Sequence, residues 1–306
     1  MTWSILGSGV TGLCVATALT QQGEKCEVIT SDTVAASHWA GGMLAPYCEA
    51  ESAPAEVTEQ GLKAITWWQQ QLGTVQKNGT LVVAPQRDTQ ELHRFAQMTQ
   101  AHTWVKPQSI EPDVADHFEK GLFFADEAHL DPRLALQQLR QNLIKQGVEF
   151  HQGKPKGKVI DCRGMASVDE LPNLRAVRGE MCILQTFDVE FSRPIRFLHP
   201  RFPCYLVPRA EGQFMLGATM LESQDAGKIS VRAMLELLTS AYMLNPAFAE
   251  AKILETGTGL RPSFANNLPE IEFKKGTYFV NGMYRHGFLL APIMAEKLVQ
   301  LIKGNV

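Results

Sequence analysis

Three glycines near the N-terminus have the spacing of a turn that binds the pyrophosphate of a dinucleotide. Gly7, Gly9 and Gly12 follow the apolar residues 2–6 and precede a helix-like segment rich in small residues. The first glycine permits a tight turn, the second lets the backbone approach a pyrophosphate, and the third lets the helix lie close to the strand. The free N–H groups of the helix N-terminus would face the anion. The sequence therefore predicts dinucleotide binding; the alternative is a glycine turn in an unrelated doubly wound fold.

The residues expected to hold the ribose depart from the usual pattern. An acidic residue normally follows the glycine turn by about 20 positions, at the end of the second strand. Here that place falls on Thr30, followed by Ser31 and Asp32. Either Asp32 reaches back to the ribose, or hydroxyl groups replace the carboxylate. No arginine lies there, so a preference for a 2′-phosphate has no support.

Alternating helices and strands must hold the glycine turn in place. Apolar runs predict strands over 2–6, 26–30, 80–84, 148–151, 158–162 and 277–281. Helices are predicted from the glycine turn to Gly23, over 55–72, from Asp131-Pro132 to Gly147, and from near Pro292 onward. We expect the first, third and last of these helices to pack on one mainly parallel sheet.

A different pattern lies between the predicted strands 158–162 and 277–281. Closely spaced strands are predicted over 180–184, 204–208 and 213–217, and a helix over about 230–244. We therefore expect an α/β fold in which a discontinuous Rossmann-like nucleotide-binding domain carries an inserted antiparallel-sheet substrate domain. The expected division assigns 1–75, 125–175 and 252–306 to the first domain, and 76–124 and 176–251 to the second.

Composition narrows the class of protein. The chain has 306 residues, 45% hydrophobic and 20% charged, with a formal net charge of −3. That charge gives no general attraction to nucleic acid, so we expect no nucleic-acid partner. The six cysteines form no CxxC pair and the histidines have no metal-binding spacing, so we expect reduced thiols and no metal site. No apolar run approaches the roughly 20 residues that span a bilayer, so a cytoplasmic protein without membrane attachment is expected.

Eight segments occur in the order seen in D-amino-acid-oxidase-like flavoproteins, and the chain resembles that family over almost its whole length. Within the family it is most similar to the glycine oxidases of thiamine biosynthesis. The segments are 7–12, 37–46, 161–164, 178–180, 204–209, 217–220, 259–262 and 284–292. In this order they are far more specific than any one of them alone.

The resemblance implies a non-covalent FAD and an activity. A small amino acid or N-alkylglycine would be oxidised at its α-carbon, and O2 would re-oxidise the flavin to give H2O2. From glycine the imine would form, which can supply thiazole synthesis or hydrolyse to glyoxylate. The alternatives are a D-amino acid oxidase or dehydrogenase of broader specificity, a tRNA-modifying flavin oxidase, and a catalytically silent binding module. The resemblance also suggests a homo-oligomer.

The resemblance also implies roles for four residues at the substrate. Arg261 would clamp the substrate carboxylate, because a planar guanidinium matches a carboxylate fork. Tyr205 would donate its hydroxyl to the same carboxylate, Met220 would line the side-chain end of the pocket, and Arg285 would present its backbone carbonyl to the amine. The competing interpretations are an interface ion pair for Arg261, a core position for Tyr205, core filling for Met220, and a solvated turn residue for Arg285.

The cofactor contacts implied by the resemblance lie in five parts of the sequence. We expect them at Gly7, Gly9, Val10, Thr11, Gly12, Thr30, Ser31, Ser37, His38, Gly41, Gly42, Met43, Leu44, Gly164, Tyr284, Arg285, His286, Gly287, Phe288 and Leu289. For His286 a packed imidazole beside the flavin is favoured over a catalytic base. Two features depart from the family, Thr30 and the short link 152–157, where relatives usually carry a hairpin. Both alter the adenosine side, so weaker FAD binding is expected.

Overall fold

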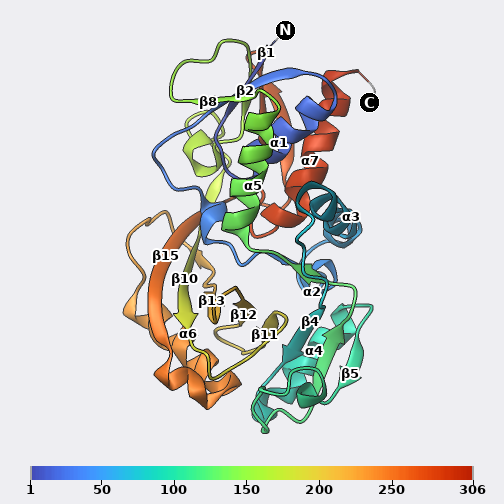
Figure 1. Ribbon diagram of the computed structural model, residues 1–306, viewed down its shortest axis with the longest axis vertical. Helices are drawn as coiled ribbons and strands as arrows, with labels where there is room; N and C mark the ends of the chain where they lie inside the picture. Colours follow the sequence, from blue (N-terminus) through green and yellow to red (C-terminus); the bar gives the residue numbers. More distant parts are fainter. Residues whose placement is uncertain (1, 305–306) are drawn as a thin grey trace.

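The computed structural model describes residues 2–304, which form two β-sheets with helices around them (Figure 1). The six-stranded sheet has the order β16-β17-β9-β1-β2-β8, and all its neighbours are parallel except β16 and β17. Its strands are β1 (Thr2–Leu6), β2 (Lys25–Ile29), β8 (Glu149–His151), β9 (Lys158–Asp161), β16 (Glu270–Lys274) and β17 (Thr277–Asn281). The parallel order brings the ends of β1, β2 and β9 to one edge of the sheet, where the glycine turn lies.

Four helices share one apolar core with this sheet. They are α1 (Val10–Gln21), α3 (Ala55–Leu72), α5 (Pro132–Lys145) and α7 (Gly287–Ile302). Helix α1 packs closely because its inner face has small side chains, among them the fully buried Cys14 and Ala16. A Cβ atom on Gly12 would collide with the carbonyl oxygen of Gly7, so only glycine allows this approach.

The second sheet has nine strands and lies at the other end of the molecule (Figure 1). Eight of them follow the order β14-β10-β13-β12-β11-β4-β6-β5, and β15 pairs with the free side of β10. The nine strands are β4 (Thr80–Val83), β5 (Thr103–Val105), β6 (Gly121–Phe124), β10 (Arg175–Gln185), β11 (Ile195–Phe197), β12 (Cys204–Pro208), β13 (Gln213–Gly217), β14 (Leu221–Glu222) and β15 (Lys252–Ser263). Most neighbouring pairs are antiparallel, so the predicted fold class is confirmed.

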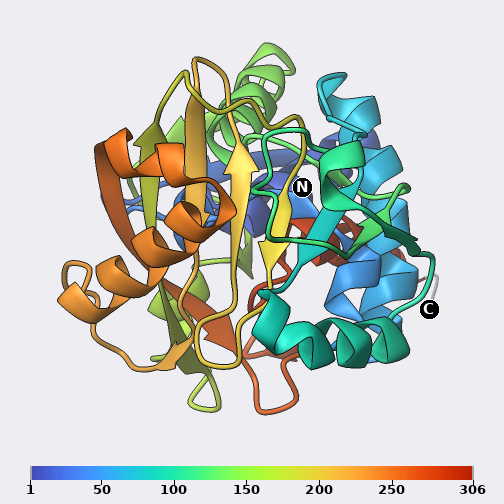
Figure 2. The same ribbon diagram turned by 90° about the horizontal axis from the view of Figure 1, so that it is seen from below.

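Short elements complete the fold. Figure 2 shows α6 (Val231–Leu244) and α4 (Thr89–Met98) over different parts of the nine-stranded sheet, where α6 contacts β10, β12 and β13 and α4 contacts β6. Between the two sheets lie β3 (Met43–Leu44), which pairs with β7 (Ala128–His129), and the single-turn helix α2 (Pro46–Glu49). The 3₁₀ turns are η1 (Ala36–Trp39), η2 (Gln86–Asp88), η3 (Pro107–Ser109), η4 (Gly164–Ser167) and η5 (Pro246–Glu250).

The closing helix begins earlier than the sequence predicts. Helix α7 starts at Gly287, and Pro292 lies inside it. A proline cannot donate the hydrogen bond that would reach the carbonyl four residues earlier, which here belongs to Phe288. The Phe288 carbonyl instead accepts a hydrogen bond of 2.7 Å from the indole nitrogen of Trp68, which is fully buried. This tertiary bond is invisible to local sequence rules, so the prediction of a start near Pro292 was wrong.

The segment after residue 251 also differs from the prediction. The sequence places 252–306 with the nucleotide-binding part. In the structure β15 instead pairs with the whole length of β10: Ser263 lies opposite Arg175 at one end, and Lys252 lies opposite Gln185 at the other. Gly257 and Gly259 lower the strand propensity of this segment and hide it from a pattern search. In the structure these glycines face the indole of Trp39, whose ring would collide with a Cβ atom on Gly257. The division into two domains otherwise stays a prediction.

Within residues 2–304, no helix has the length and apolar character needed to cross a membrane.

Candidate active site

The turn between β1 and α1 has the shape of an anion cradle. Gly7 adopts a φ of +99°, and a Cβ atom there would lie 2.8 Å from the Cys162 carbonyl oxygen. A Cβ atom on Gly9 would lie 3.3 Å from the Ala35 Cβ and 3.4 Å from the Ser37 Oγ. The backbone N–H of Val10 donates to Ser37 Oγ at 3.2 Å. A bare backbone, a hydroxyl and a helix N-terminus therefore converge, and this donor set fits a pyrophosphate.

The two residues predicted at the ribose lie at the end of β2. The backbone N–H of Thr30 donates to the His151 carbonyl at 2.9 Å, and its hydroxyl lies 3.4 Å from the same oxygen. Ser31 is exposed. Asp32, the alternative, accepts a 2.7 Å hydrogen bond from the side chain of Gln152, in the short link. In this arrangement Thr30 contacts the end of β8, and Asp32 contacts the short link 152–157.

The segment from Ser37 to Leu44 runs between the two sheets. Its η1 turn places Trp39 against the glycines of β15. Gly41 lies so close to the ring of Tyr205 on β12 that a side chain would not fit between them. Gly42 has a φ of +74°, and its carbonyl accepts a 2.9 Å hydrogen bond from the Leu130 N–H. Close packing against backbone thus explains why this stretch is rich in small residues.

The turn between β17 and α7 meets the β1–α1 turn. A Cβ atom on Gly287 would lie 3.3 Å from Val10 Cγ1, so the N-termini of α7 and α1 are adjacent. Tyr284 adopts a φ of +49°, and its N–H donates to the Pro262 carbonyl at 2.8 Å. The carbonyl of Gly164 accepts a 3.0 Å hydrogen bond from the side chain of Asn281. The last predicted cofactor segment therefore joins the first, next to Arg261.

The remaining predicted cofactor residues take their positions from these elements. Val10, Thr11, Leu44, His286, Phe288 and Leu289 are buried, while His38 and Met43 are half-buried. Burial lowers the pKa of His286 to about 4, against the opposing effect of the nearby Glu49 carboxylate. The imidazole is therefore neutral near pH 7 and buried.

Arg261 projects from β15 over the backbone of Gly179 on β10. Its guanidinium would collide with any side chain at Gly179, and one nitrogen donates to the Thr219 carbonyl at 3.0 Å. Among residues 2–304, no aspartate or glutamate oxygen lies within 4.0 Å of this guanidinium. An interface ion pair, the competing interpretation, is therefore absent from the described part of the chain.

Met220 and Arg285 lie together at the edge of this region. The Met220 sulfur is 3.7 Å from the Tyr284 hydroxyl and 3.6 Å from an Arg285 guanidinium nitrogen. Met220 is 45% exposed, so it does not fill the core. The Arg285 side chain is not a solvated turn residue, because it pairs with Glu49 at 2.7 Å and bonds Ser52 at 2.6 Å. Sequence reasoning missed Glu49, which has no local signal that distinguishes it from a surface acid.

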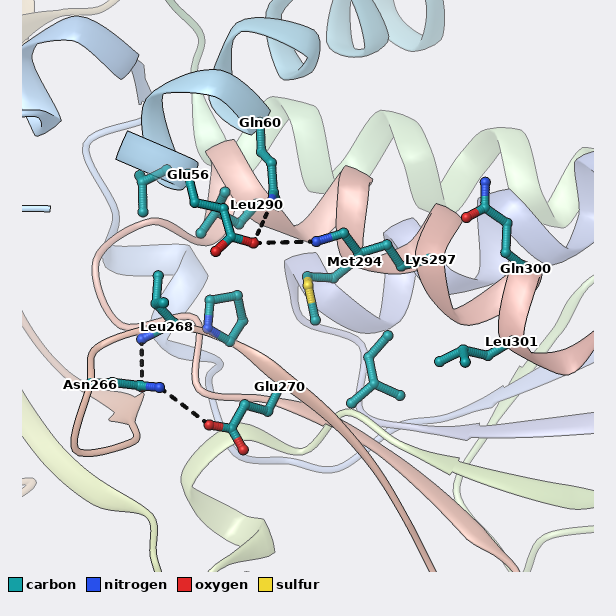
Figure 3. Close-up of a pocket in the computed structure, with 13 residues that line it drawn as sticks. Glu56, Gln60, Asn266, Leu268, Glu270, Leu290, Met294, Lys297, Gln300 and Leu301 are labelled. Carbon is teal, nitrogen blue, oxygen red and sulfur yellow. Dashed lines mark hydrogen bonds and ion pairs between the residues drawn. The ribbon is translucent and has the colours of Figure 1, made fainter. Parts of the chain in front are cut away.

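Two cavities lie near these elements. A cleft of about 260 Å³ is lined by His38, by Arg209, whose side chain is 8% exposed, and by Met181 and Met215 of the nine-stranded sheet. A larger groove of about 500 Å³ runs between α3, α7 and residues 266–271, where Glu56 and Lys297 face each other at 3.5 Å (Figure 3). None of the residues that line the larger groove belongs to the predicted site.

Comparisons with known proteins show the family to which the chain belongs. The model of the family described as "FAD dependent oxidoreductase" matches residues 3–301. A Rhizobium etli protein that carries the name thiamine biosynthesis oxidoreductase ThiO is 47% identical over 96% of this chain and 94% of its own length.

Solved structures share the fold at lower identity. The glycine oxidase of Bacillus cereus has a TM-score of 0.83 at 20% identity, covering 99% of this chain and 97% of its own. The iminodiacetate oxidase of Chelativorans sp. has a TM-score of 0.84 at 19% identity, covering 99% and 95%. The family match over nearly the whole chain and the cradle at the β1–α1 turn lead to one conclusion: the chain is an FAD-dependent enzyme that belongs to the FAD-dependent oxidoreductase family.

Proposed function

We propose that the protein oxidises glycine or another small amino acid or N-alkylglycine at its α-carbon. Bound FAD supplies the hydride acceptor for this chemistry and is re-oxidised by O2. Two electrons and two protons leave the C–N unit of the substrate and appear in H2O2. The remaining imine either enters thiazole synthesis or hydrolyses to glyoxylate and ammonium. The name of the Rhizobium etli relative supports the link to thiamine biosynthesis.

The observation that carries the proposal is the state of Arg261. A half-buried guanidinium is normally paired with a carboxylate, because an unpaired buried charge is costly. Among the described residues Arg261 bonds only to the Thr219 carbonyl, although Arg178, on neighbouring β10, has carboxylate partners. A substrate carboxylate would supply the missing anion and could bind in the two-pronged geometry that a guanidinium favours.

The other residues orient the substrate rather than transfer protons. We assign the Tyr205 hydroxyl to the same carboxylate and the Arg285 backbone carbonyl to the amine. Met220 would limit the space for a side chain on the α-carbon. Holding the substrate by its two charged ends fixes the C–H bond toward the cofactor, and such orientation can lower a barrier by several kcal/mol. A neutral, buried His286 adds no charge to this pocket.

The proposal is tested by anaerobic titration of the purified holoenzyme with glycine, sarcosine and D-alanine. Glycine or sarcosine is expected to bleach the flavin absorbance, and air is expected to restore it with release of H2O2. Bleaching by D-alanine at a comparable or greater rate would favour the broader D-amino acid oxidase. If none of the three substrates bleaches the flavin, the proposed function is wrong.

Arg261→Ala gives the sharpest test of the carboxylate clamp. We expect KM for glycine to rise about 100-fold, because hydrogen bonds to a charged group contribute roughly 1.5–3 kcal/mol. FAD content and the unfolding midpoint should stay close to those of the native protein. Arg232→Ala is the matched control, since Arg232 is exposed on α6 and forms, within residues 2–304, a single ion pair, with Glu236 at 3.7 Å. Equal KM values in the two variants would show that Arg261 does not bind the substrate carboxylate.

A further inference from the structure

Glu49, the last residue of α2, joins three elements that surround the proposed site. Its carboxylate lies 2.7 Å from Arg285 Nε and 3.3 Å from His286 Nδ1, both in the turn before α7. On the other side it lies 3.9 Å from a guanidinium nitrogen of Arg196 on β11. The side chain of Glu49 is only 15% exposed, and His286 is buried. One carboxylate therefore connects the loop between the sheets, the nine-stranded sheet and the turn before α7.

The turn that Glu49 holds sets the start of α7. His286 is the N-cap residue of that helix, and its carbonyl accepts the N–H groups of Leu289 and Leu290 at 2.9 and 2.8 Å. On its other side the turn is tied to β15 by the Tyr284 N–H and the Pro262 carbonyl, next to Arg261. Tyr284 has a left-handed backbone conformation, which is unfavourable for a non-glycine residue. The turn therefore depends on tertiary contacts to keep its shape.

The charges around Glu49 favour an ionised carboxylate. Burial raises its pKa, but the charged partners of Glu49, above all the Arg285 guanidinium, outweigh that effect, and the pKa lies below its ordinary value. A second acid, Glu51, stands two residues later and pairs with the same Arg196 at 2.8 Å and with Arg94 at 2.8 Å. Glu51 has no ion pair with Arg285 or His286 among the described residues. The chain thus offers two acids with one shared partner, of which only Glu49 contacts the turn.

We propose that Glu49 is a positioning residue that holds the turn Tyr284–His286, and with it the N-terminus of α7, against the flavin. This inference rests on the proposed placement of the flavin at that turn. The positive end of a helix dipole stabilises negative charge close to it, and the reduced flavin carries more negative charge than the oxidised one. A displaced turn would therefore weaken FAD binding and disfavour reduction, whereas a general loss of stability would leave the reduction potential of the bound flavin unchanged.

The experiment compares Glu49→Gln with Glu51→Gln as the matched control. FAD is titrated into each apoprotein and its dissociation constant is measured from the quenching of flavin fluorescence. The reduction potential of each saturated holoenzyme is then measured. We expect Glu49→Gln to raise the Kd for FAD about tenfold and to make the potential more negative. Glu51→Gln should leave Kd within twofold of the native value and the potential unchanged.

A second variant protects the test against simple misfolding. Arg285→Met removes the same ion pair from the other side and should reproduce the change in Kd and potential if Glu49→Gln does not fold. Equal values for Glu49→Gln and Glu51→Gln would overturn the inference, and so would a native potential in Glu49→Gln. The proposed function fails by a different result, an absence of flavin bleaching by glycine in the native holoenzyme, so the two failures can be told apart.

Discussion

Two buried carboxylates, one in each region of the molecule, have opposite surroundings. Glu27 lies in the six-stranded sheet and accepts hydrogen bonds from Ser4 Oγ at 2.6 Å and the Lys156 N–H at 2.8 Å, with His151 Nε2 at 3.0 Å. Glu127 lies beneath α2, between the sheets, and accepts one bond of 2.8 Å from the Cys48 N–H. Its other oxygen, Oε2, has no hydrogen-bond partner among the described residues.

The balance between burial and hydrogen bonding decides the charge of each acid. Burial raises the pKa of Glu27, but the bonds from Ser4, His151 and Lys156 outweigh it and bring the pKa to about 2. Burial dominates at Glu127 and raises its pKa to about 7. The six-stranded sheet therefore contains an ionised acid whose charge is met by hydrogen bonds. The region around α2 between the two sheets, called the junction below, contains an acid that is partly protonated near neutral pH.

The largest expected effect on the free energy of unfolding comes from replacing Glu27, the carboxylate with more hydrogen bonds. Glu27→Ala leaves the donors of Ser4 and of the link residue Lys156 without their acceptor in a buried place. Unsatisfied buried donors cost roughly 1–3 kcal/mol each, so we expect a loss of about 3–5 kcal/mol in the free energy of unfolding. Urea denaturation at pH 7 measures this loss. Glu149→Ala is the control, because Glu149 is exposed and shares the Lys156 ammonium at 2.7 Å. Equal losses in both variants would contradict the comparison.

The same contrast explains how much of the fold the sequence could predict. The glycines at 7, 9 and 12 act through the absence of a side chain, and the following helix and parallel strands are local patterns. The fold class of the chain and its family were therefore predictable from the sequence. The Asp131 helix cap was also predictable, since the Asp131 side chain accepts from the Arg133 N–H at 2.8 Å, two residues away.

The junction was harder to predict because its contacts join distant segments. Glu49 and Arg285 are 236 positions apart, counted from their residue numbers, and no local pattern connects them. The start of α7 depends on Trp68, which satisfies the carbonyl that Pro292 frees. Strand β15 contains two glycines, and its pairing with β10 becomes clear only when Trp39 is seen to pack on them. Tertiary contacts override local propensity at each of these places.

A second, intermediate effect concerns acid stability. Because the folded-state pKa of Glu27 lies below its ordinary value of 4.5, its contribution is fully present above pH 4.5 and is lost as the pH falls toward 2. Glu27→Gln cannot titrate, so its unfolding free energy should fall less between pH 6 and pH 3, by about 2 kcal/mol. Urea denaturation at the two pH values measures the difference. Parallel acid losses in the native protein and the variant would show that Glu27 is not held ionised.

The smallest expected effect has the opposite sign and lies at the junction. The folded-state pKa of Glu127 is above its ordinary value, so the folded protein holds more protons than the unfolded chain between pH 4.5 and 7. Stability is therefore lost as the pH rises through that window. Glu127→Gln keeps an acceptor for the Cys48 N–H and offers a donor to the hydroxyl of Thr80, which has no hydrogen-bond partner among the described residues.

We expect Glu127→Gln to be more stable than the native protein at pH 8 by about 1–2 kcal/mol and nearly equal at pH 5. In the native protein the Thr80 hydroxyl can turn toward the ionised Glu127 carboxylate and reduce the cost of burying its charge. The gain in the free energy of unfolding is therefore expected to be smaller than the pKa shift alone would give. Denaturation at the two pH values measures it, and Glu111→Gln is a useful contrast. Glu111 is equally buried but accepts bonds from Ser192 and Arg193, so its replacement should destabilise at both pH values. A loss for Glu127→Gln at pH 8 would mean that the junction holds its carboxylate as firmly as the six-stranded sheet does.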